Sequence, residues 1–231
     1  MIYAWYIFFI MQLHDKMLKT VTRLLWDLKF PIVCSLDCEY VTIGMPTELC
    51  SDPKHVITEI VKICCVKYDI INNKEIDHIA VFVKPTHVNN ANGDFLWFKD
   101  LTGITQDDLD NGIDLSDAIN QLKEFVGILP IIVMRKDPDV LYYDTKHRCI
   151  EPWDIEITHK VFRLKPNISV FFNVLNIKTE KNIKGGDLYK LLPKSMLKGS
   201  LAINKHIIVH DSLWNARSTA CFIAHVLDLI N

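Results

Sequence analysis

The feature that most constrains the fold is an apolar run that ends in two closely spaced carboxylates. The apolar run 31–34 is followed by Ser35 and Leu36 and then by Asp37, Cys38 and Glu39. In a β-strand, residues two positions apart point to the same face, so this pattern predicts a strand that presents Asp37 and Glu39 side by side. Two carboxylates so close repel each other unless a cation lies between them. The pair therefore suits a site for Mg²⁺ or Mn²⁺, although the solvated end of a strand explains the pair equally well when it is taken alone.

The composition indicates the size of the hydrophobic core but does not identify a binding partner. The 231 residues are 49% hydrophobic, which is enough for one large domain or two small ones. The net charge of −2 gives no general attraction to nucleic acid. The seven cysteines form no C-x-x-C pair, and Cys64 and Cys65 lie within an apolar run. We therefore expect an intracellular, reducing compartment such as the cytoplasm or nucleus.

The N-terminal part of the chain differs from the rest. Residues 1–13 are apolar and rich in aromatic side chains, without a basic region before them. This stretch makes a poor signal peptide and is too short for a helix that spans a bilayer, so we expect no stable membrane span. Helical character follows at 18–28. We divide the chain into an apolar and helical extension at 1–29 and one domain at 30–231.

The order of strand and helix patterns within that domain predicts an α/β fold. Strands are expected at 32–38, 59–68 and 78–84, with a turn at Asn72-Asn73-Lys74 between the last two. Thr105 is expected to cap a helix, with Asp108 as its reciprocal capping-box partner.

The second half of the chain alternates helices and strands. Apolar residues at helical spacing predict an amphipathic helix that begins at Ser116, and the apolar run 131–134 is typical of a strand buried on both faces. A short helix is expected at 188–192. A C-terminal helix is expected with an apolar face of Leu213, Ala220, Ala224 and Leu227. This order of elements indicates an α/β layer fold with a central sheet flanked by helices.

These patterns, taken in order, resemble the DEDDh 3′–5′ exonucleases, which have a ribonuclease H-like fold. The resemblance rests on Asp37/Glu39, on the turn Leu101-Thr102-Gly103-Ile104-Thr105 and on His210 before the last helix. It runs from about residue 32 to residue 229 and is greatest to the exoribonucleases that trim histone mRNA and small RNAs. It implies a mixed central sheet, four acidic residues that hold two divalent cations, Mg²⁺ or Mn²⁺, and a histidine that handles the attacking water.

Carried over residue by residue, the resemblance assigns most of a catalytic site. Asp37 and Glu39 match the first motif. For the second motif Asp139 has the best register, with Asp137 and Asp144 as alternatives. The third motif, a histidine followed after four residues by an acid, is read as His210 and Asn215. The metal ligands would thus be Asp37, Glu39, Asp139 and Asn215, with His210 as general base.

Asn215 departs from the family pattern. Its amide oxygen can coordinate a hard cation but brings no charge, so we expect weaker metal binding. Asp211 is a residue that could compensate. The resemblance further implies that Tyr40 or Leu101 stacks on the terminal base of the substrate.

The sequence therefore supports three hypotheses about function. The first is a metal-dependent 3′–5′ exonuclease acting on single-stranded RNA or DNA ends. The second is a degenerate, catalytically impaired member of the same fold that binds nucleic acid or a protein partner. The third is an unrelated α/β scaffold. A lysine-rich stretch at 173–206 and an acidic one at 94–124 would allow one face to follow phosphates while the net charge stays near zero.

Overall fold

The computed structural model describes residues 31–44, 56–87, 94–164 and 211–230, together with 172, 188 and 190–192. Within these residues the centre is one sheet in the order β3-β2-β1-β4-β5. The strands are β1 (Ile32–Gly44), β2 (Val56–Asp69), β3 (Lys74–Phe82), β4 (Ile131–Val133) and β5 (Val161–Arg163).

The sheet is mixed because a local meander is extended by strands from later in the chain. β1, β2 and β3 pair antiparallel, and the turn between β2 and β3 places Asn73 at a φ of 50°. Asparagine tolerates this left-handed conformation better than most residues, so the expected turn is explained by its sequence. β4 then lies parallel to β1, and β5 lies parallel to β4. The predicted α/β fold with a mixed central sheet is confirmed.

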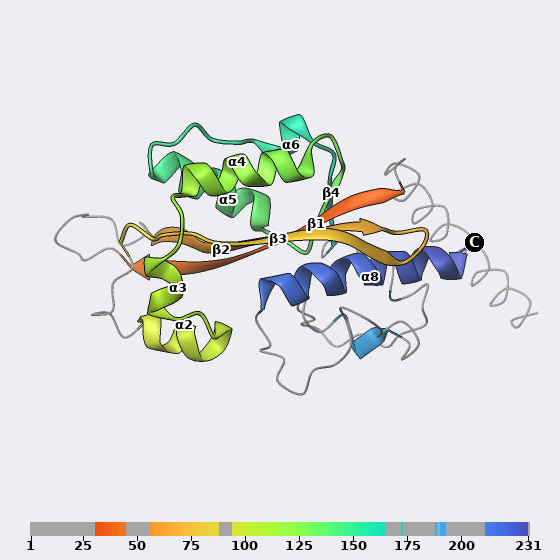
Figure 1. Cartoon of the computed structure of the whole chain (residues 1–231), viewed down its shortest axis with the longest axis horizontal. Coiled ribbons are helices and arrows are strands. Elements are labelled where there is room, and N and C mark those ends of the chain that lie inside the picture. The colour runs from red at the N-terminus through yellow and green to blue at the C-terminus, as the bar shows by residue number, and fades with distance from the viewer. Residues whose placement is uncertain are drawn as a thin grey trace, which may run out of the picture.

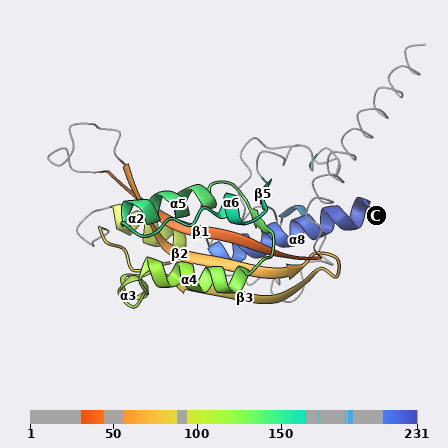
Figure 2. The same ribbon diagram turned by 90° about the horizontal axis from the view of Figure 1, so that it is seen from above.

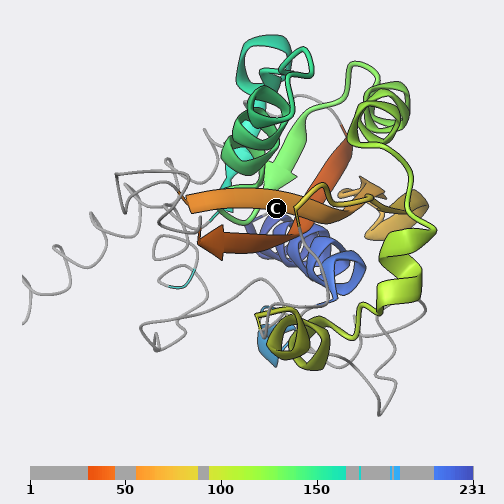
Figure 3. The same cartoon turned by 90° about the vertical axis from the view of Figure 1, so that its left-hand side faces the viewer.

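Helices cover the two faces of the sheet (Figure 1). Helices α4, α5 and α6 lie on one face, and α8 lies along the other; Figure 3 shows the same layers from the side. Figure 2 shows α4 and α5 running over the strands. The helices are α2 (Asp94–Thr102), α3 (Gln106–Asp110), α4 (Leu115–Val126), α5 (Asp137–His147), α6 (Ile155–Thr158) and α8 (Ser212–Ile230).

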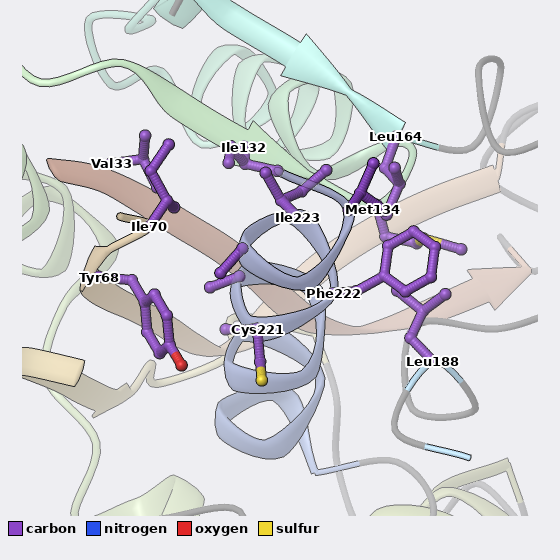
Figure 4. Close-up of a cluster of buried hydrophobic side chains, with 14 of the residues drawn as sticks. Val33, Tyr68, Ile70, Ile132, Met134, Leu164, Leu188, Cys221, Phe222 and Ile223 are labelled. Atoms are coloured by element: carbon purple, nitrogen blue, oxygen red, sulfur yellow. The ribbon is translucent and has the colours of Figure 1, made fainter. Parts of the chain in front are cut away.

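Alternate side chains of the sheet form two separate cores. On the α8 face, Val33 and Ile132 pack against Phe222 and Ile223, which Figure 4 shows in close-up. On the opposite face, the sheet packs against Leu122 of α4 and its neighbours. Successive residues of a strand point to opposite faces, so each buried strand feeds both cores. The side chains of Asp37 and Glu39 therefore fall on the α8 face, between the two helical layers.

Local sequence signals account for several helix ends. Thr105 accepts a hydrogen bond from the backbone N–H of Asp108, and the Asp108 carboxylate accepts one from the backbone N–H of Thr105, so the predicted capping box is confirmed. Helix α4 begins at Leu115, one residue before the prediction. It buries Leu115, Ala118, Ile119, Leu122 and Val126, the apolar positions expected from the helical spacing.

The sequence prediction missed other elements. Helix α2, helix α5 and strand β5 were not predicted, α6 was expected only as one of several short helices without bounds, and β3 begins at Lys74 rather than near 78. The first half of β3 lies at the edge of the sheet and carries exposed polar side chains. It therefore lacks the alternation of apolar and polar residues from which a strand is predicted. The expected N-terminal extension 1–29, most of the lysine-rich stretch 173–206 and His210 lie outside the described residues.

Two further observations concern the described part of the chain. None of its helices is long and apolar enough to cross a membrane. Cys34, Cys38, Cys64, Cys65, Cys149 and Cys221 are free thiols. The compartment itself stays a prediction.

Candidate active site

The first two carboxylates lie on β1 where this strand meets a β-bulge. Asp37 is paired with Cys64 of β2, and Glu39 is paired with Lys62. The register shifts immediately afterwards, because Tyr40 pairs with Ile60 and Val61 is left as the extra residue. Bulges re-aim side chains and occur next to active sites. The predicted side-by-side placement of Asp37 and Glu39 follows from their common strand and face.

A third carboxylate reaches the same place from β4. Strands β1 and β4 are parallel, with Leu36 paired to Val133, so their carboxyl ends lie together. Asp137 is the first residue of α5, immediately beyond β4, and it is buried. One of its carboxylate oxygens accepts a hydrogen bond of 2.9 Å from the backbone N–H of Cys38, the residue between Asp37 and Glu39. Topology and this bond together fix Asp137 beside the first motif.

Helix α8 supplies two more oxygen-bearing side chains from its first turn. The side-chain amide of Asn215 donates a hydrogen bond of 3.2 Å to Asp37. The Asn215 side-chain oxygen is buried and has no hydrogen-bond partner among the described residues. Such an oxygen is costly to leave unsatisfied, and an amide oxygen beside Asp37 could serve as a ligand to a cation.

Asp211 stands at the start of α8 and acts as its cap. Its Oδ1 atom accepts a hydrogen bond of 3.0 Å from the backbone N–H of Leu213 and one of 3.1 Å from the ammonium of Lys62. The hydroxyl of Ser212 also donates to the sulfur of Cys64, which lies opposite Asp37 on β2. The first turn of α8 is therefore attached to the part of β2 that faces the acidic residues.

These side chains line a cleft of about 600 Å³. Its walls include three acidic residues, two basic residues and a set of apolar side chains. The residues are Asp37, Cys38, Glu39, Tyr40, Val41, Thr42, Phe98, Leu101, Met134, Arg135, Lys136, Asp137 and Asn215. The predicted base-stacking residues Tyr40 and Leu101 are thus both on the wall of the cleft that holds Asp37 and Glu39.

The acidic residues disfavour one another's charge. Burial, together with the charges of Asp137 and Glu39, raises the pKa of Asp37 well above its usual value, although the hydrogen bond from Asn215 opposes this. Burial raises the pKa of Glu39 to about 8, with Lys62 opposing and Asp137 and Asp211 adding to the rise. Burial raises the pKa of Asp137 to about 6, while the hydrogen bond from Cys38 lowers it. The protein has gathered carboxylates where their charges are poorly compensated.

The donor set fits divalent cations that prefer oxygen. Asp37, Glu39, Asp137 and Asp211 influence one another electrostatically, and the buried oxygen of Asn215 is unsatisfied. Hard cations such as Mg²⁺ and Mn²⁺ take carboxylate and amide oxygens. In the described residues these carboxylates do not form a preassembled group of three or more metal-ligating side chains. Hydrogen bonds to Cys38, Asn215 and Lys62 hold them in their present positions instead.

The structure separates the three alternatives for the second acidic motif. Asp139, which the sequence analysis preferred, lies outside the cleft, where it is 49% exposed and forms an ion pair of 2.9 Å with Arg163. Asp144 is buried beneath the sheet, where it accepts a hydrogen bond from the backbone N–H of Ile60 and pairs with Arg148. Only Asp137 of the three faces Asp37. The preference for Asp139 is therefore not supported by its position, because Asp137 is held against β1 by the hydrogen bond from Cys38 while Asp139 is exposed and paired with Arg163.

Sequence comparison supplies the family. A family model for the RNase T exonucleases matches residues 35–170. This span covers more than half of the chain and includes both β1 carboxylates and Asp137. The chain belongs to this exonuclease family. A comparison with curated protein sequences gives no significant match.

Solved structures share the fold at low sequence identity. One describes "3′-end specific recognition of histone mRNA stem-loop by 3′-exonuclease", with 13% identity, a TM-score of 0.62 and coverage of 86% of this chain and 82% of the other. Another is the nuclease domain of 3′hExo, a DEDDh family member bound to rAMP, with 14% identity, a TM-score of 0.61 and coverage of 86% and 92%. E. coli exonuclease I in complex with a dT13 oligonucleotide has 14% identity, a TM-score of 0.54 and coverage of 84% and 41%. The ribonuclease H-like fold of the DEDDh exonucleases, expected from the sequence, is thereby confirmed.

The sequence analysis did not identify Lys62 as a neighbour of the acidic residues, and it gave Asp211 only a secondary role. Lys62 was not noticed, because nothing in the sequence places it opposite Glu39 until the strand register is known. Asp211 was named only as a residue that could compensate for Asn215. A usable signal did exist: His206 stands five positions before Asp211, with four residues between them, which is the spacing required of the third motif.

The raised pKa values predict how the stability of the metal-free exonuclease depends on pH. A carboxyl with a raised pKa holds its proton more tightly in the folded state than in the unfolded chain. This contribution to stability is present at low pH and is lost as the pH rises from the ordinary values of 3.8 and 4.5 toward about 8 for Glu39. In EDTA, the Tm of the wild type should therefore fall more between pH 5.5 and pH 8 than the Tm of Glu39→Gln.

Thermal unfolding followed by circular dichroism measures this difference. A difference of at least about 2–4 °C is expected, the shift that 1 kcal/mol produces in a domain of this size. Asp107→Asn, at an exposed position of α3, serves as a control for the loss of a carboxylate elsewhere. Identical pH dependence in the wild type and Glu39→Gln would show that Glu39 is not held in its neutral form by the fold.

Proposed function

We propose that the chain is a metal-dependent exonuclease that releases nucleotides from the 3′ ends of single-stranded RNA or DNA. The observation that carries this proposal is the convergence of Asp37, Glu39 and Asp137 in one cleft, next to a buried and unsatisfied oxygen of Asn215. Clustered carboxylates and an unsatisfied buried oxygen lower the stability of a fold, and proteins retain them where a charged ligand compensates for this loss. The 3′ direction is supported by the names of the solved structures that share the fold.

The residues that would hold divalent cations are Asp37, Glu39, Asp137 and Asp211. Bound there, such cations supply an activated water and stabilise the negative charge that develops on the leaving 3′-oxygen. Asp37 is central because its neighbours on β1, β4 and α8 all act on it. Asn215 holds the Asp37 carboxylate in position with its amide group, and its oxygen is directed to where a ligand is needed.

The remaining walls of the cleft suit the end of a nucleic-acid chain. Tyr40, Phe98 and Leu101 form an apolar side on which a terminal base can stack, since stacking on aromatic and apolar groups tolerates every base. Arg135 and Lys136 lie across from them and are exposed, so they can contact phosphates. None of these contacts distinguishes RNA from DNA, and we propose both as substrates to be tested.

We place the third motif at His206 and Asp211. The spacing of a histidine, four residues and a following position occurs twice, at His206–Asp211 and at His210–Asn215. The first ends in a carboxylate whose charge acts on both Asp37 and Glu39, and the second ends in a neutral amide. We therefore propose His206 as general base, in place of His210, which the sequence analysis expected. An imidazole suits this role because its ordinary pKa lies near neutral pH, so it accepts a proton from water readily.

This placement weakens the case for a degenerate, binding-only protein. That hypothesis was motivated by Asn215 as the last motif residue. With Asp211 in that role, the chain retains four acidic residues, and Asn215 becomes a positioning residue for Asp37. A binding-only function would be the conclusion if the folded chain bound nucleic-acid ends without shortening them.

The proposal predicts metal-dependent shortening of a labelled strand. A single-stranded RNA and the matching DNA, labelled at the 5′ end, should give a ladder that shortens from the 3′ end with Mg²⁺ or Mn²⁺ and not with EDTA. Asp137→Asn should reduce the rate about a hundredfold or more, since loss of several kcal/mol of charge stabilisation has this effect. Asp139→Asn is the matched control two positions away and should retain the wild-type rate.

Two results would contradict the proposal. Shortening in EDTA would exclude dependence on a divalent cation. A loss of activity in Asp139→Asn with none in Asp137→Asn would restore the second motif to Asp139 and refute the placement derived from the cleft.

A second prediction tests the register of the third motif. His206→Ala and Asp211→Asn should each lower the rate about a hundredfold, while His210→Ala should lower it less than about threefold. Rates are measured on the same labelled strand with saturating Mn²⁺, after circular dichroism has shown that each variant is folded. The opposite pattern, in which His210→Ala is inactive and His206→Ala is active, would place the motif at His210 and Asn215.

A further inference from the structure

Lys62 lies beside the acidic cleft, between Glu39 and Asp211. It stands on β2 opposite Glu39, and its side chain is only 15% exposed. Its ammonium lies 3.1 Å from Asp211 Oδ1 and 5.3 Å from the centre of the Phe82 ring. A carboxylate and an aromatic face both attract a cation, so this position is favourable for a fixed positive charge.

The ammonium contacts or neighbours the acids that a divalent cation would otherwise need to neutralise. It pairs directly with Asp211, and its charge opposes the rise in the pKa of Glu39. By their contacts, the acids fall into two sets. Glu39 lies opposite Lys62 on the neighbouring strand and Asp211 pairs with it, whereas Asp37 and Asp137 accept hydrogen bonds from Asn215 and from the backbone N–H of Cys38.

We propose that Lys62 is a built-in counter-ion that takes the place of one divalent cation, so that this exonuclease binds a single ion, between Asp37 and Asp137. This inference rests on the proposed function and narrows it: of the four acidic residues named there, Asp37 and Asp137 would hold the ion, while Lys62 would neutralise Glu39 and Asp211. It differs from the two ions implied by the family resemblance. An ammonium is a compact point charge on a flexible stem, and fixed charges in a water-poor site stabilise developing negative charge on a phosphate. Lys62 would therefore act as a positioning and electrostatic residue where a second ion would stand.

A purely structural role for Lys62 makes a different prediction. An ion pair that only fastened β2 to the start of α8 would affect stability when removed, but it would leave the number of bound ions unchanged. The stoichiometry of Mn²⁺ binding therefore separates the two roles without any measurement of activity. Arg163 provides a matched control, because it forms an ion pair with Asp139 outside the cleft.

The experiment is a titration of the full chain with Mn²⁺ alone at pH 7.5, with free Mn²⁺ followed by electron paramagnetic resonance. We expect one bound ion in the wild type and in Arg163→Met, and two in Lys62→Met. Lys62→Gln serves as a second neutral variant that keeps a polar end, and it should also bind two. Circular dichroism establishes that each variant used is folded.

Several outcomes would overturn the inference. These are two ions bound to the wild type, none bound to the wild type, or one ion bound to folded Lys62→Met and Lys62→Gln alike. The wild-type stoichiometry is informative even if neither variant folds. Failure of the proposed function is distinguishable: a chain that binds one ion, gains a second in the variants and never shortens RNA or DNA would support the role of Lys62 and refute the exonuclease.

Discussion

The structure depends on the mutual repulsion of carboxylates that the fold brings close together. Asp37 and Glu39 share one face of β1, and the parallel pairing of β1 with β4 brings Asp137 to the same edge. Burial raises the pKa of each of these groups, and neighbouring carboxylates add to the rise for Asp37 and Glu39. An apolar set of side chains at these positions would be more stable, because buried charges cost more than they return unless they are compensated. The sheet is therefore organised around a site that is unfavourable in the absence of a ligand.

The surrounding structure limits this cost without removing it. The backbone N–H of Cys38 and the amide of Asn215 each donate to a carboxylate, and Lys62 gives a positive charge to Asp211. Elsewhere Asp144 and Arg148 fasten α5 to β2 close to the bulge beside Glu39. Contacts of this kind orient the side chains that would hold an ion, as the surroundings of a catalytic site are expected to do.

The sequence predicted those features that depend on local pattern. The side-by-side carboxylates of β1, the meander with its turn at Asn73, the capping box at Thr105 and the apolar face of α4 all follow from short-range rules, and each is present. Features that depend on register between distant strands were not predictable in this way. Asp137 and Asp139 are two residues apart on one helix, and the sequence does not show that Asp137 is the one that accepts the hydrogen bond from Cys38 of β1. Lys62 enters the site solely because β2 pairs with β1 in one register.

The third motif shows a different limit. Two histidines precede α8 at equivalent spacing to Asp211 and Asn215, and the spacing rule cannot choose between them. We chose Asp211 because of its charge, which acts on the first-motif carboxylates, and because its carboxylate pairs with the ammonium of Lys62. The resemblance to exonucleases supplied the right family and fold, while physical contacts decided which residues fill its roles.

The central claim is that the cleft bounded by β1, β4 and α8 is a catalytic metal site. The most direct measurement is a crystal structure of the full chain grown with Mn²⁺, in which anomalous scattering locates the ion. The account predicts a Mn²⁺ peak within coordinating distance, about 2.0–2.4 Å, of carboxylate oxygens of both Asp37 and Asp137. A peak at Asp139, or a folded and crystallised chain with no Mn²⁺ at Asp37, would contradict it.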